Sequence, residues 1–520
     1  MRELRPLLPS LLALALLACG GAEAPRRPRW VVIGVDGAER TVVEALWAEG
    51  KLPVLHELAD RGLWSGLATD FGISPVIWTT VATGVDPETH GITGFAISTP
   101  DGDAPVSSTL RRVPALWNML TAAGRAVDVV SWWATWPAEP IAGVMVSDRA
   151  GLGVGNEVTP PEMEGTWRQW AAAADRGENA FPGDDVAQRD RRTAAAAERL
   201  AAGHRDLLMA YFRDVDVTCH VAWKGWEPER FPPQDPAEEA ALRARVVGAY
   251  EATDEAIGRI LAAAGPGVNV LVLSDHGFHA KVPERGRVAV DLDEILEGLG
   301  YQARDAEGGI DWSRTSLYTY EAPPFRSLKK VRCATVGREP EGRFDATACA
   351  EARRRLEADL PRITYASGLP VLGLRDATDE ERAAGADFMV VVAREEPSTS
   401  LQLDGRPWRG FTTRVSRLSG THSPHWAGIV LAAGPDVDPH GDIRGMSVRD
   451  IAPTLLYGLG LPVGEDFTGR VRFELFRDEV RRSHRLRTVE SWGRSAPGEA
   501  AVSAADEELL QELRALGYIE

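Results

Sequence analysis

Carboxylate and imidazole side chains follow several of the apolar runs in this sequence. Asp36 follows WVVIGV, and the pair Asp275 and His276 follows VNVLVLS. Asp216 and His220 follow LLMAYFRDV in the spacing Asp-x-x-x-His, and His422 lies in the turn SGTHSPH. Carboxylate oxygens and imidazole nitrogens are typical ligands of divalent zinc, whose catalytic sites keep one position open. Each residue alone could serve a turn or a core, but together they predict a metal site.

A serine at the start of a short predicted helix is the candidate nucleophile. The stretch ISPVIWTTVATG predicts a helix with Ser74 as N-cap, Pro75 as its first residue and Gly84 after its end. Such an N-terminus attracts anions, phosphate among them, through its dipole and free N–H groups. Most Ser-Pro helix starts are only caps, so a nucleophilic role depends on the metal site. The hydroxyls inside the helix are weaker candidates: Thr79, Thr80 and Thr83.

The three aspartates and three histidines are enough to hold two divalent metal ions, with Ser74 completing the set. Two metal ions a few ångströms apart can hold the attacking and leaving oxygens of a phosphoryl displacement. A serine next to such ions loses its proton more easily than a free serine, so it needs no histidine base.

Strand and helix patterns alternate along the chain, which predicts an α/β protein with a mainly parallel central sheet covered by helices. In open sheets of this kind, ligands bind beyond the carboxyl ends of the strands, where the candidate residues lie. Strands are predicted over 30–35, 126–133, 268–277, 386–394 and 426–434, and helices over 52–62, 116–124, 189–212 and 447–460.

The composition is that of a large globular protein. The chain has 520 residues, of which 44% are hydrophobic and 26% are charged, so it can bury a large core. Its net charge of -18 argues against binding a nucleic-acid polymer, which requires clustered lysine and arginine. A small phosphoester held by metal ions remains compatible with this charge.

The first residues, MRELRPLLPSLLALALLACGG, are interpreted as a targeting segment. Residues 1–18 are a predicted lipoprotein signal peptide, Cys19 the lipid acceptor, and residues 19–29 a tether. The alternatives are an ordinary secretory signal or an ordinary membrane anchor. The prediction is an exported bacterial lipoprotein of the cell envelope, periplasmic or anchored in the outer membrane through its N-terminal lipid.

Two segments, at about 155–205 and 280–370, are predicted insertions that could form a lid or could be surface decoration. Residues 476–520 are a predicted helical tail, with Ser503 and Asp506 in capping-box spacing. Cys333 and Cys349 could close a short loop in an oxidising compartment, and Cys219 is predicted to be free.

The ordered set of motifs resembles the alkaline phosphatase superfamily, and within it the type I phosphodiesterase/nucleotide pyrophosphatase-like branch. The resemblance covers roughly residues 30–475. It is carried by VVIGVDG, ISPVIWTTVATGVDPETHGI, DVDVTCH, LVLSDHGF, SGTHSPHWAGIVLAAGP and RDIAPTLLYGLGLPVGEDFTGR. It implies a three-layer alkaline-phosphatase-like catalytic domain with inserted lid or cap segments, two divalent metals, most simply Zn²⁺, and a phosphoserine intermediate.

The resemblance also implies a role for each position. One metal would take Asp36, Ser74 and the pair Asp275 and His276, with Ser74 as the catalytic nucleophile. The other metal would take the three remaining ligands: Asp216, His220 and His422.

One position departs from the family pattern. Many diesterase relatives carry an asparagine three residues after the nucleophile, where it contacts a phosphoryl oxygen, and here that position is Ile77. Lys224, soon after His220, is a possible substitute contact, although a solvated lysine is the simpler interpretation. The sulfatase branch is disfavoured, because SPVI lacks its modification motif. The tryptophans at 132, 133, 136, 223 and 226 could form an aromatic wall for a flat leaving group or could pack in the core.

The leading hypothesis is a two-metal phosphoester hydrolase of the phosphodiesterase/nucleotide pyrophosphatase kind, acting on a small phosphoester. The alternatives are a phosphomonoesterase, a phospho-alcohol transferase of the cell envelope, or a non-catalytic envelope lipoprotein. The sequence does not indicate the substrate or the oligomeric state.

Overall fold

The structure is a computed structural model. It describes residues 29–99, 102–176, 185–231, 234–281, 292–305, 309–319, 328–340, 342–383, 385–393, 401–408, 418–423, 427–496 and 498–519. The predicted signal peptide and the lipid acceptor Cys19 lie outside these residues.

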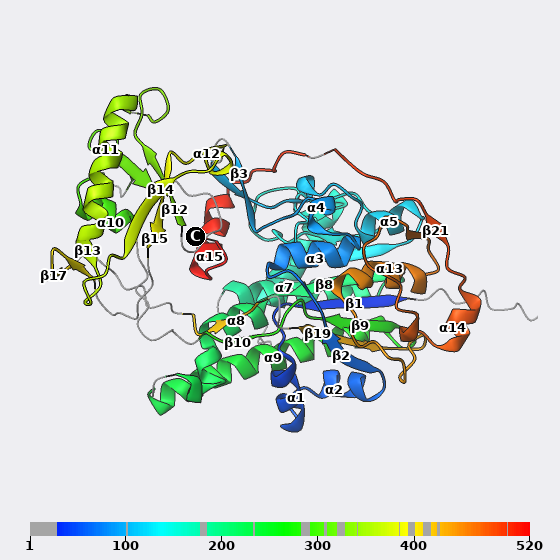
Figure 1. Ribbon diagram of the computed structural model, residues 1–520. Helices are drawn as coiled ribbons and strands as arrows, with labels where there is room; N and C mark the ends of the chain where they lie inside the picture. Colours follow the sequence, from blue (N-terminus) through cyan, green and yellow to red (C-terminus); the bar gives the residue numbers. More distant parts are fainter. Residues whose placement is uncertain are drawn as a thin grey trace, which may run out of the picture.

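Among the described residues, an eight-stranded sheet forms the centre of the main body (Figure 1). The neighbours β9, β1, β8, β5 and β6 run parallel, while β19 is antiparallel to both β9 and β2, and β7 is antiparallel to β6. The sheet is therefore mainly parallel, as predicted. In spatial order its strands are β2 (Leu63–Leu67), β19 (Gly428–Ala433), β9 (Asn269–Leu273), β1 (Trp30–Val35), β8 (Leu207–Phe212), β5 (Val127–Val130), β6 (Met145–Val146) and β7 (Val158–Thr159).

Helices cover both faces of this sheet, because its central strands are apolar on both sides. In β1, Val31, Ile33 and Val35 pack into one hydrophobic cluster, and Trp30 and Val32 pack into another. The first cluster includes side chains of α1 (Arg40–Ala48), α2 (Pro53–Asp60), α6 (Glu164–Arg176), α7 (Asp185–Ala201), α8 (Asp214–Ala222) and α9 (Pro236–Ala264). The second includes side chains of α3 (Ser74–Thr83), α5 (Leu116–Ala122) and α13 (Ile451–Gly458). The predicted three-layer arrangement is confirmed.

The prediction of a helix over 189–212 is wrong for its last part. Helix α7 ends at Ala201, and the six residues Leu207–Phe212 form strand β8 between β1 and β5. All six are buried. A continuous apolar run has no period that distinguishes a buried strand from a buried helix, so sequence periodicity could not separate the two.

The other predicted elements are found in the structure, with one difference of placement. The predicted strand at 386–394 is β15 (Phe388–Val392), but it lies outside the central sheet. It belongs to a four-stranded antiparallel sheet with β11 (Leu317–Thr319), β12 (Leu328–Cys333) and β14 (Leu372–Asp376).

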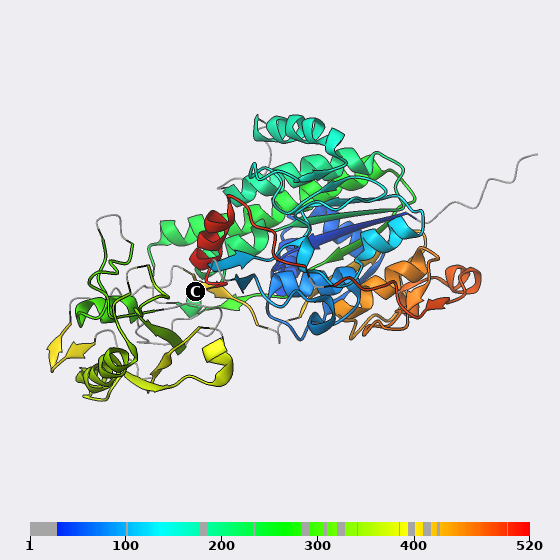
Figure 2. The ribbon, with the colours of Figure 1, turned by 90° about the horizontal axis from the view of Figure 1, so that it is seen from above.

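This second sheet forms a separate part of the molecule, inserted between β10 (His279–Ala280) and β18 (Gly420–Thr421) (Figure 2). It has its own hydrophobic cluster, which includes side chains of α10 (Leu292–Gly298) and α11 (Ala346–Asp359). A disulfide between Cys333 and Cys349 joins β12 to α11. Cys219 is buried and forms no disulfide in the described chain. The smaller elements of this part are α12 (Asp379–Ala383), β13 (Ile363–Thr364), β16 (Gln402–Leu403) and β17 (Arg406–Pro407).

The remaining elements lie in the main body or the C-terminal region. They are the hairpin β3 (Ala96–Thr99) and β4 (Gly102–Pro105), α4 (Pro87–His90), the parallel pair β20 (Val463–Gly464) and β21 (Thr488–Val489), α14 (Asp478–Ser483) and α15 (Asp506–Ala515). In the part of the chain that the structure describes, every helix is too short or too polar to span a bilayer.

Candidate active site

Three adjacent parallel strands deliver five of the predicted ligands to one edge of the central sheet. Asp36 directly follows β1, and Asp275 and His276 follow β9. Asp216 and His220 lie one turn apart on α8, which begins two residues after β8 ends. Because β9, β1 and β8 are neighbours and run parallel, their carboxyl ends meet, and all five side chains are buried together there.

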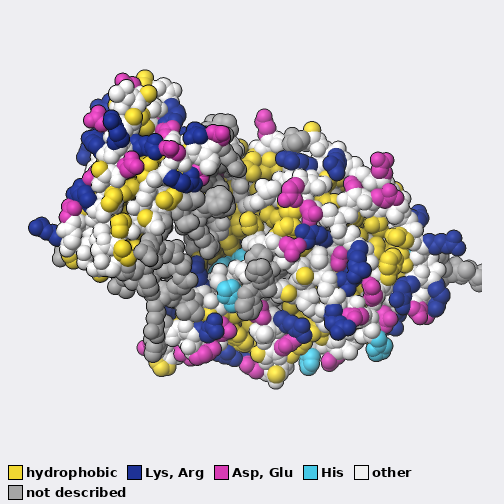
Figure 3. Space-filling view, viewed as in Figure 1, with side chains coloured by type: hydrophobic (Ala, Val, Ile, Leu, Met, Phe, Trp, Pro, Cys, Tyr) yellow, Lys and Arg dark blue, Asp and Glu magenta, His cyan; other side chains and the backbone are white. Residues whose placement is uncertain are grey.

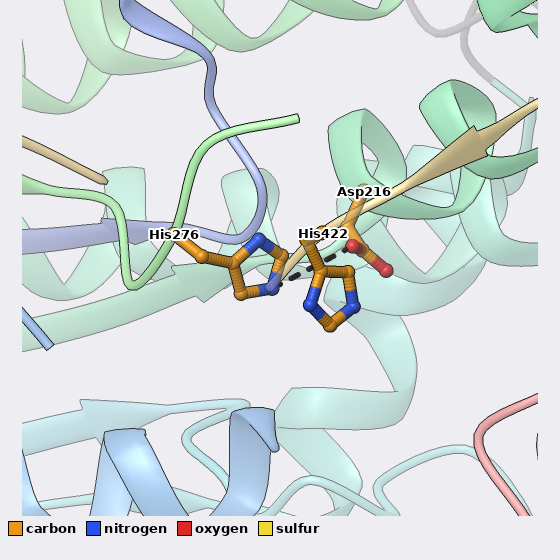
Figure 4. Close-up of side chains that lie close together, drawn as sticks. All are labelled: Asp216, His276 and His422. Atoms are coloured by element: carbon orange, nitrogen blue, oxygen red, sulfur yellow. Dashed lines mark ion pairs between the residues drawn. The ribbon is translucent and has the colours of Figure 1, made fainter. Parts of the chain in front are cut away.

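His422 reaches the same place from a distant part of the chain. It follows β18, which pairs with β10 just after His276. The approach of β18 to α8 requires a glycine, because a Cβ on Gly420 would lie 2.2 Å from the carbonyl oxygen of Cys219. The His422 ring stacks on that of His276 at 3.7 Å between centroids and lies 5.3 Å from that of His220. Figure 4 shows the His276 and His422 rings side by side, with the Asp216 carboxylate next to His422.

His276 is the centre of the cluster. Its Nε2 atom lies 3.3 Å from Asp36 Oδ1, 3.4 Å from Asp275 Oδ2 and 3.9 Å from Asp216 Oδ1. Among the residues that the structure describes, two groups of side chains have ligand atoms close enough to share a cation: Asp36 with Asp275 and His276, and Asp216 with His276 and His422. The first group contains three of the four residues predicted for one metal, the fourth being Ser74. The second contains His276 in place of His220, whose Nε2 lies 3.5 Å from Asp216 Oδ1.

One atom of each of four candidate ligands is held by the protein, Asp216 Oδ2 by the Tyr518 hydroxyl, while another atom faces the cluster. Asp275 Oδ1 accepts a hydrogen bond from the Gly37 amide, and His220 Nδ1 and His276 Nδ1 contact the carbonyl oxygens of Gly420 and Gly277. The opposite atoms, Asp275 Oδ2, Asp216 Oδ1, His220 Nε2 and His276 Nε2, are buried and have no hydrogen-bond partner among the described residues. Buried polar atoms almost always have a hydrogen-bond partner. A cluster of carboxylate oxygens and imidazole nitrogens without such partners therefore fits divalent cations.

The charges of the cluster favour a cation as well. Burial and the neighbouring Asp36 carboxylate raise the pKa of Asp275 to about 8, and the same two causes raise the pKa of Asp216 well above its usual range. Burial alone would lower the pKa of His276, but Asp275 and Asp36 raise it to about 10. Three carboxylates crowded around one imidazole repel one another in a buried site, and bound cations would relieve this repulsion.

Ser74 lies at the edge of this cluster, and the prediction that it is the helix N-cap is wrong. Helix α3 begins at Ser74, and the cap position belongs to Ile73, whose carbonyl accepts from the amides of Val76 and Ile77. The Ser74 hydroxyl is therefore not used for capping and instead lies 3.4 Å from Asp36 Oδ1. Helix α3 ends at Thr83, and Gly84 follows it, as predicted; this glycine adopts the left-handed conformation.

The threonine hydroxyls of α3 are occupied by the helix itself. Each donates to the carbonyl oxygen four residues earlier, Thr79 to Pro75 at 2.7 Å, Thr80 to Val76 at 2.9 Å and Thr83 to Thr79 at 2.8 Å. His90 is buried against Thr80 at 3.0 Å and lies outside both ligand groups. Ser74 is thus the hydroxyl of α3 that faces the cluster.

Aromatic residues that the sequence did not single out hold the other oxygen of Asp36. Asp36 Oδ2 accepts from Trp78 Nε1 at 3.2 Å and from the Tyr211 hydroxyl, which itself accepts from Trp133 Nε1 at 2.7 Å. Burial and the neighbouring Asp36 raise the pKa of Tyr211 well above its usual range, so its hydroxyl stays a donor. These contacts orient Asp36 and leave Oδ1 facing Ser74 and His276.

The remaining predicted residues are placed as follows. Ile77 is fully buried in the core cluster beneath α3. Lys224 forms an ion pair with Glu238 at 2.7 Å. Among the clustered tryptophans, Trp132, Trp136 and Trp223 are buried, while Trp133 and Trp226 are half-buried. Figure 3 shows histidine side chains at the surface of the main body on the side that faces the inserted part.

The sequence matches one protein family. The model of the type I phosphodiesterase/nucleotide pyrophosphatase family matches residues 30–363, more than half of the chain and a span that includes six of the seven predicted site residues. The chain belongs to this family. The members of this family are metal-dependent phosphoester hydrolases. Membership assigns this activity to the chain. The predicted resemblance is confirmed.

Several solved structures are similar at low sequence identity. Murine ectonucleotide pyrophosphatase/phosphodiesterase 5, as an inactive variant in complex with AMP, is 16% identical, with 87% of this chain and 100% of that chain covered and a TM-score of 0.44. The human protein of the same name is 14% identical, with the same coverage and TM-score. Phosphonoacetate hydrolase from Sinorhizobium meliloti, with phosphonoformate, is 15% identical, with 83% and 95% covered and a TM-score of 0.42. No curated protein sequence matches the chain significantly.

Proposed function

We propose that the protein is a phosphodiesterase that uses two divalent metal ions, Zn²⁺ in the simplest case, and forms a phosphoserine intermediate on Ser74. The observation that carries this proposal is the position of the Ser74 hydroxyl. Ser74 is the first residue of helix α3, and its hydroxyl is not used for capping. The hydroxyl lies 3.4 Å from Asp36 Oδ1, at the edge of a cluster of buried side-chain atoms that could bind metal and have no hydrogen-bond partner among the described residues. Asp36, Asp275 and His276 would hold one ion, and Asp216, His220 and His422 the other.

The bound ions would lower the pKa of the Ser74 hydroxyl and stabilise charge on the leaving oxygen. The chain's own groups position the reaction. Ser74 Oγ forms a bond to phosphorus while the bond from phosphorus to one alcohol oxygen breaks, and that alcohol leaves with a proton. Water then attacks the same phosphorus, releases Ser74 and yields a phosphomonoester. The N-terminus of α3 directs its positive dipole end toward the phosphoryl oxygens.

The charges around the site favour a diester over a monoester. A diester carries one negative charge at neutral pH and a monoester close to two, so a monoesterase needs an additional cation at the phosphoryl group. Two cationic side chains of this region are already paired: Arg213, which acts on Asp216, with Glu512 at 2.9 Å, and Lys224, four residues after His220, with Glu238 at 2.7 Å. Neither is left to compensate the second charge of a monoester.

The test compares two chromogenic substrates with the purified, Zn²⁺-loaded protein. We expect kcat/KM for bis-p-nitrophenyl phosphate to exceed that for p-nitrophenyl phosphate by at least about tenfold. A tenfold ratio corresponds to a difference of about 1.4 kcal/mol in transition-state stabilisation. A preference for the monoester would make the protein a phosphatase. Release of p-nitrophenol only when an alcohol acceptor is added would make the protein a transferase. The absence of any metal-dependent release of p-nitrophenol would refute hydrolysis.

We also propose that the mature protein is an envelope lipoprotein anchored through Cys19, on the basis of the leader sequence alone. A Cys19→Ser variant expressed in a bacterium should move from the detergent-soluble membrane fraction to the soluble fraction or remain uncleaved. A variant that still partitions into membranes with a normally processed N-terminus would refute lipid anchoring.

A further inference from the structure

The C-terminal segment reaches the candidate metal site, 302 residues away in the sequence from the ligand it contacts. The hydroxyl of Tyr518 donates a hydrogen bond to Asp216 Oδ2. The Tyr518 ring meets the His220 ring edge-on, with 5.1 Å between centroids, and stacks on Phe95 at 4.6 Å. Figures 1 and 2 show α15, which directly precedes this tyrosine, lying against the end of the main body beside the inserted part.

The turn after α15 directs Tyr518 back toward the site. Gly517 adopts the left-handed conformation with φ 71°, and the Tyr518 amide donates to the carbonyl of Leu513 at 2.9 Å. This is the pattern in which a glycine ends a helix and the next residue bonds back across the last turn. A side chain with a Cβ at position 517 would be strained in this conformation, so the turn depends on glycine.

Helix α15 is held in place by buried and half-buried ion pairs. Glu512 pairs with Arg213 at 2.9 Å and with Arg189 at 3.1 Å, and Asp506 pairs with Arg149 at 2.7 Å. The Arg149 side chain is only 3% exposed. These pairs fix the segment rather than letting it lie loosely on the surface.

Apolar contacts join the segment to the helix that carries two ligands. Leu516 packs in one cluster with Val186 and with Val217, the residue next to Asp216 on α8. Leu510, Leu513 and Ile519 are buried with Phe95. The position of Tyr518 relative to Asp216 is therefore set by packing on both sides of the contact.

The two carboxylate oxygens of Asp216 have different surroundings because of the Tyr518 hydrogen bond. Oδ2 is held by the tyrosine, while Oδ1 lies 3.5 Å from His220 Nε2 and 3.9 Å from His276 Nε2 and has no hydrogen-bond partner among the described residues. A carboxylate held in this way presents one defined oxygen to a cation, which is how partners behind a ligand tune its affinity for metal.

We propose that Tyr518 is a positioning residue of the metal site: it fixes Asp216 with Oδ1 toward the cation, and the C-terminal segment 503–519 is a structural component of the active site. This inference rests on the proposed function, because it assigns Asp216 to a divalent metal. It predicts that metal affinity depends on a single hydroxyl at the far end of the chain.

The test is the Zn²⁺ affinity of Tyr518→Phe in the full chain, measured by competition with a chromophoric chelator. We expect the weaker-bound ion to lose about tenfold or more in affinity, the range found when a group behind a metal ligand is removed. The phenyl ring keeps its stack on Phe95, so the melting temperature of the metal-free protein should change little. With subsaturating Zn²⁺, kcat should fall more than KM rises.

Two further variants separate positioning from packing. Tyr301→Phe is the matched control, because Tyr301 also donates to an aspartate, Asp359 at 2.7 Å, but in the inserted part of the chain. It should bind Zn²⁺ as the wild type does. Tyr518→Ala removes the ring as well: if Tyr518 only packs, alanine weakens binding and phenylalanine does not.

The outcomes distinguish this inference from the proposed function. Wild-type affinity in Tyr518→Phe overturns the positioning role, whatever the enzyme hydrolyses. Weaker binding in Tyr518→Phe supports it even where neither chromogenic substrate is turned over. A wild-type protein that binds no Zn²⁺, Mn²⁺ or Co²⁺ overturns both.

Discussion

A Ser74→Ala variant should hydrolyse bis-p-nitrophenyl phosphate at least on the order of 10³-fold more slowly than the wild type, as expected when a nucleophile is removed. The hydroxyl lies 3.4 Å from Asp36 Oδ1 at the start of α3, and alanine cannot form the bond to phosphorus. The measurement is kcat/KM at saturating Zn²⁺, with metal content determined on the same sample so that a lost ion is not mistaken for a lost nucleophile.

A hydroxyl on the next turn of the same helix provides the control for Ser74→Ala. Thr79 is buried and donates to Pro75, so Thr79→Val removes a hydroxyl that the helix already uses and should leave kcat/KM close to that of the wild type. Acid-quenching the wild type during turnover should leave a phosphorylated peptide that contains Ser74 and is missing from Ser74→Ala. Wild-type kcat/KM in Ser74→Ala would refute the covalent mechanism.

Much of the candidate site could be predicted because its candidate ligands stand next to strong local signals. Asp36, Asp275 and His276 directly follow apolar strands, and neighbouring parallel strands place their ends together. The pair Asp216 and His220 has the spacing of one helical turn, which the structure realises on α8. The end of α3 at Gly84 could be predicted for the same local reason, because glycine readily adopts the left-handed conformation found there.

The contacts behind the ligands could not be predicted, because they depend on packing between distant segments. Tyr211 lies in the middle of the apolar run that forms β8, where nothing in the local pattern distinguishes it from a core residue. Trp78 faces Asp36 only because α3 packs on the sheet beside β1. Tyr518 meets Asp216 through a turn and ion pairs that involve residues hundreds of positions apart.

Local chemistry also misled the sequence interpretation at two places. Serine before proline is a common helix start, but the extended residue before α3 is Ile73, which leaves the Ser74 hydroxyl to the site. The run at 207–212 carries no periodicity, so its strand conformation is decided by its place between β1 and β5. In both cases tertiary contacts, rather than local preference, determine the outcome.

A His276→Ala variant should lose affinity for both metal ions, because His276 is a proposed ligand of the ion at Asp36 and Asp275 and its ligand atom also lies within reach of those of Asp216 and His422, which would hold the other ion. Its Nε2 atom lies within 3.9 Å of three buried carboxylates, and alanine supplies no ligand in its place. We expect Zn²⁺ affinity to fall by at least about 100-fold, since loss of a direct ligand should cost no less than loss of a group behind one. Hydrolysis should be lost with it.

Thermodynamic linkage gives a second measurement of this loss that is independent of turnover. At a free Zn²⁺ concentration of about 1,000 times the wild-type Kd, one site stabilises the folded protein by about 4 kcal/mol. A 100-fold weaker site leaves about 1.4 kcal/mol at the same concentration. The Zn²⁺-induced rise in melting temperature should therefore shrink to about a third.

His90→Gln is the matched control, because His90 is also buried but contacts Thr80 and lies outside both ligand groups. It should lower the melting temperature of the metal-free protein and keep the full rise on adding Zn²⁺. An unchanged rise in His276→Ala would show that the cluster around His276 does not bind the metal.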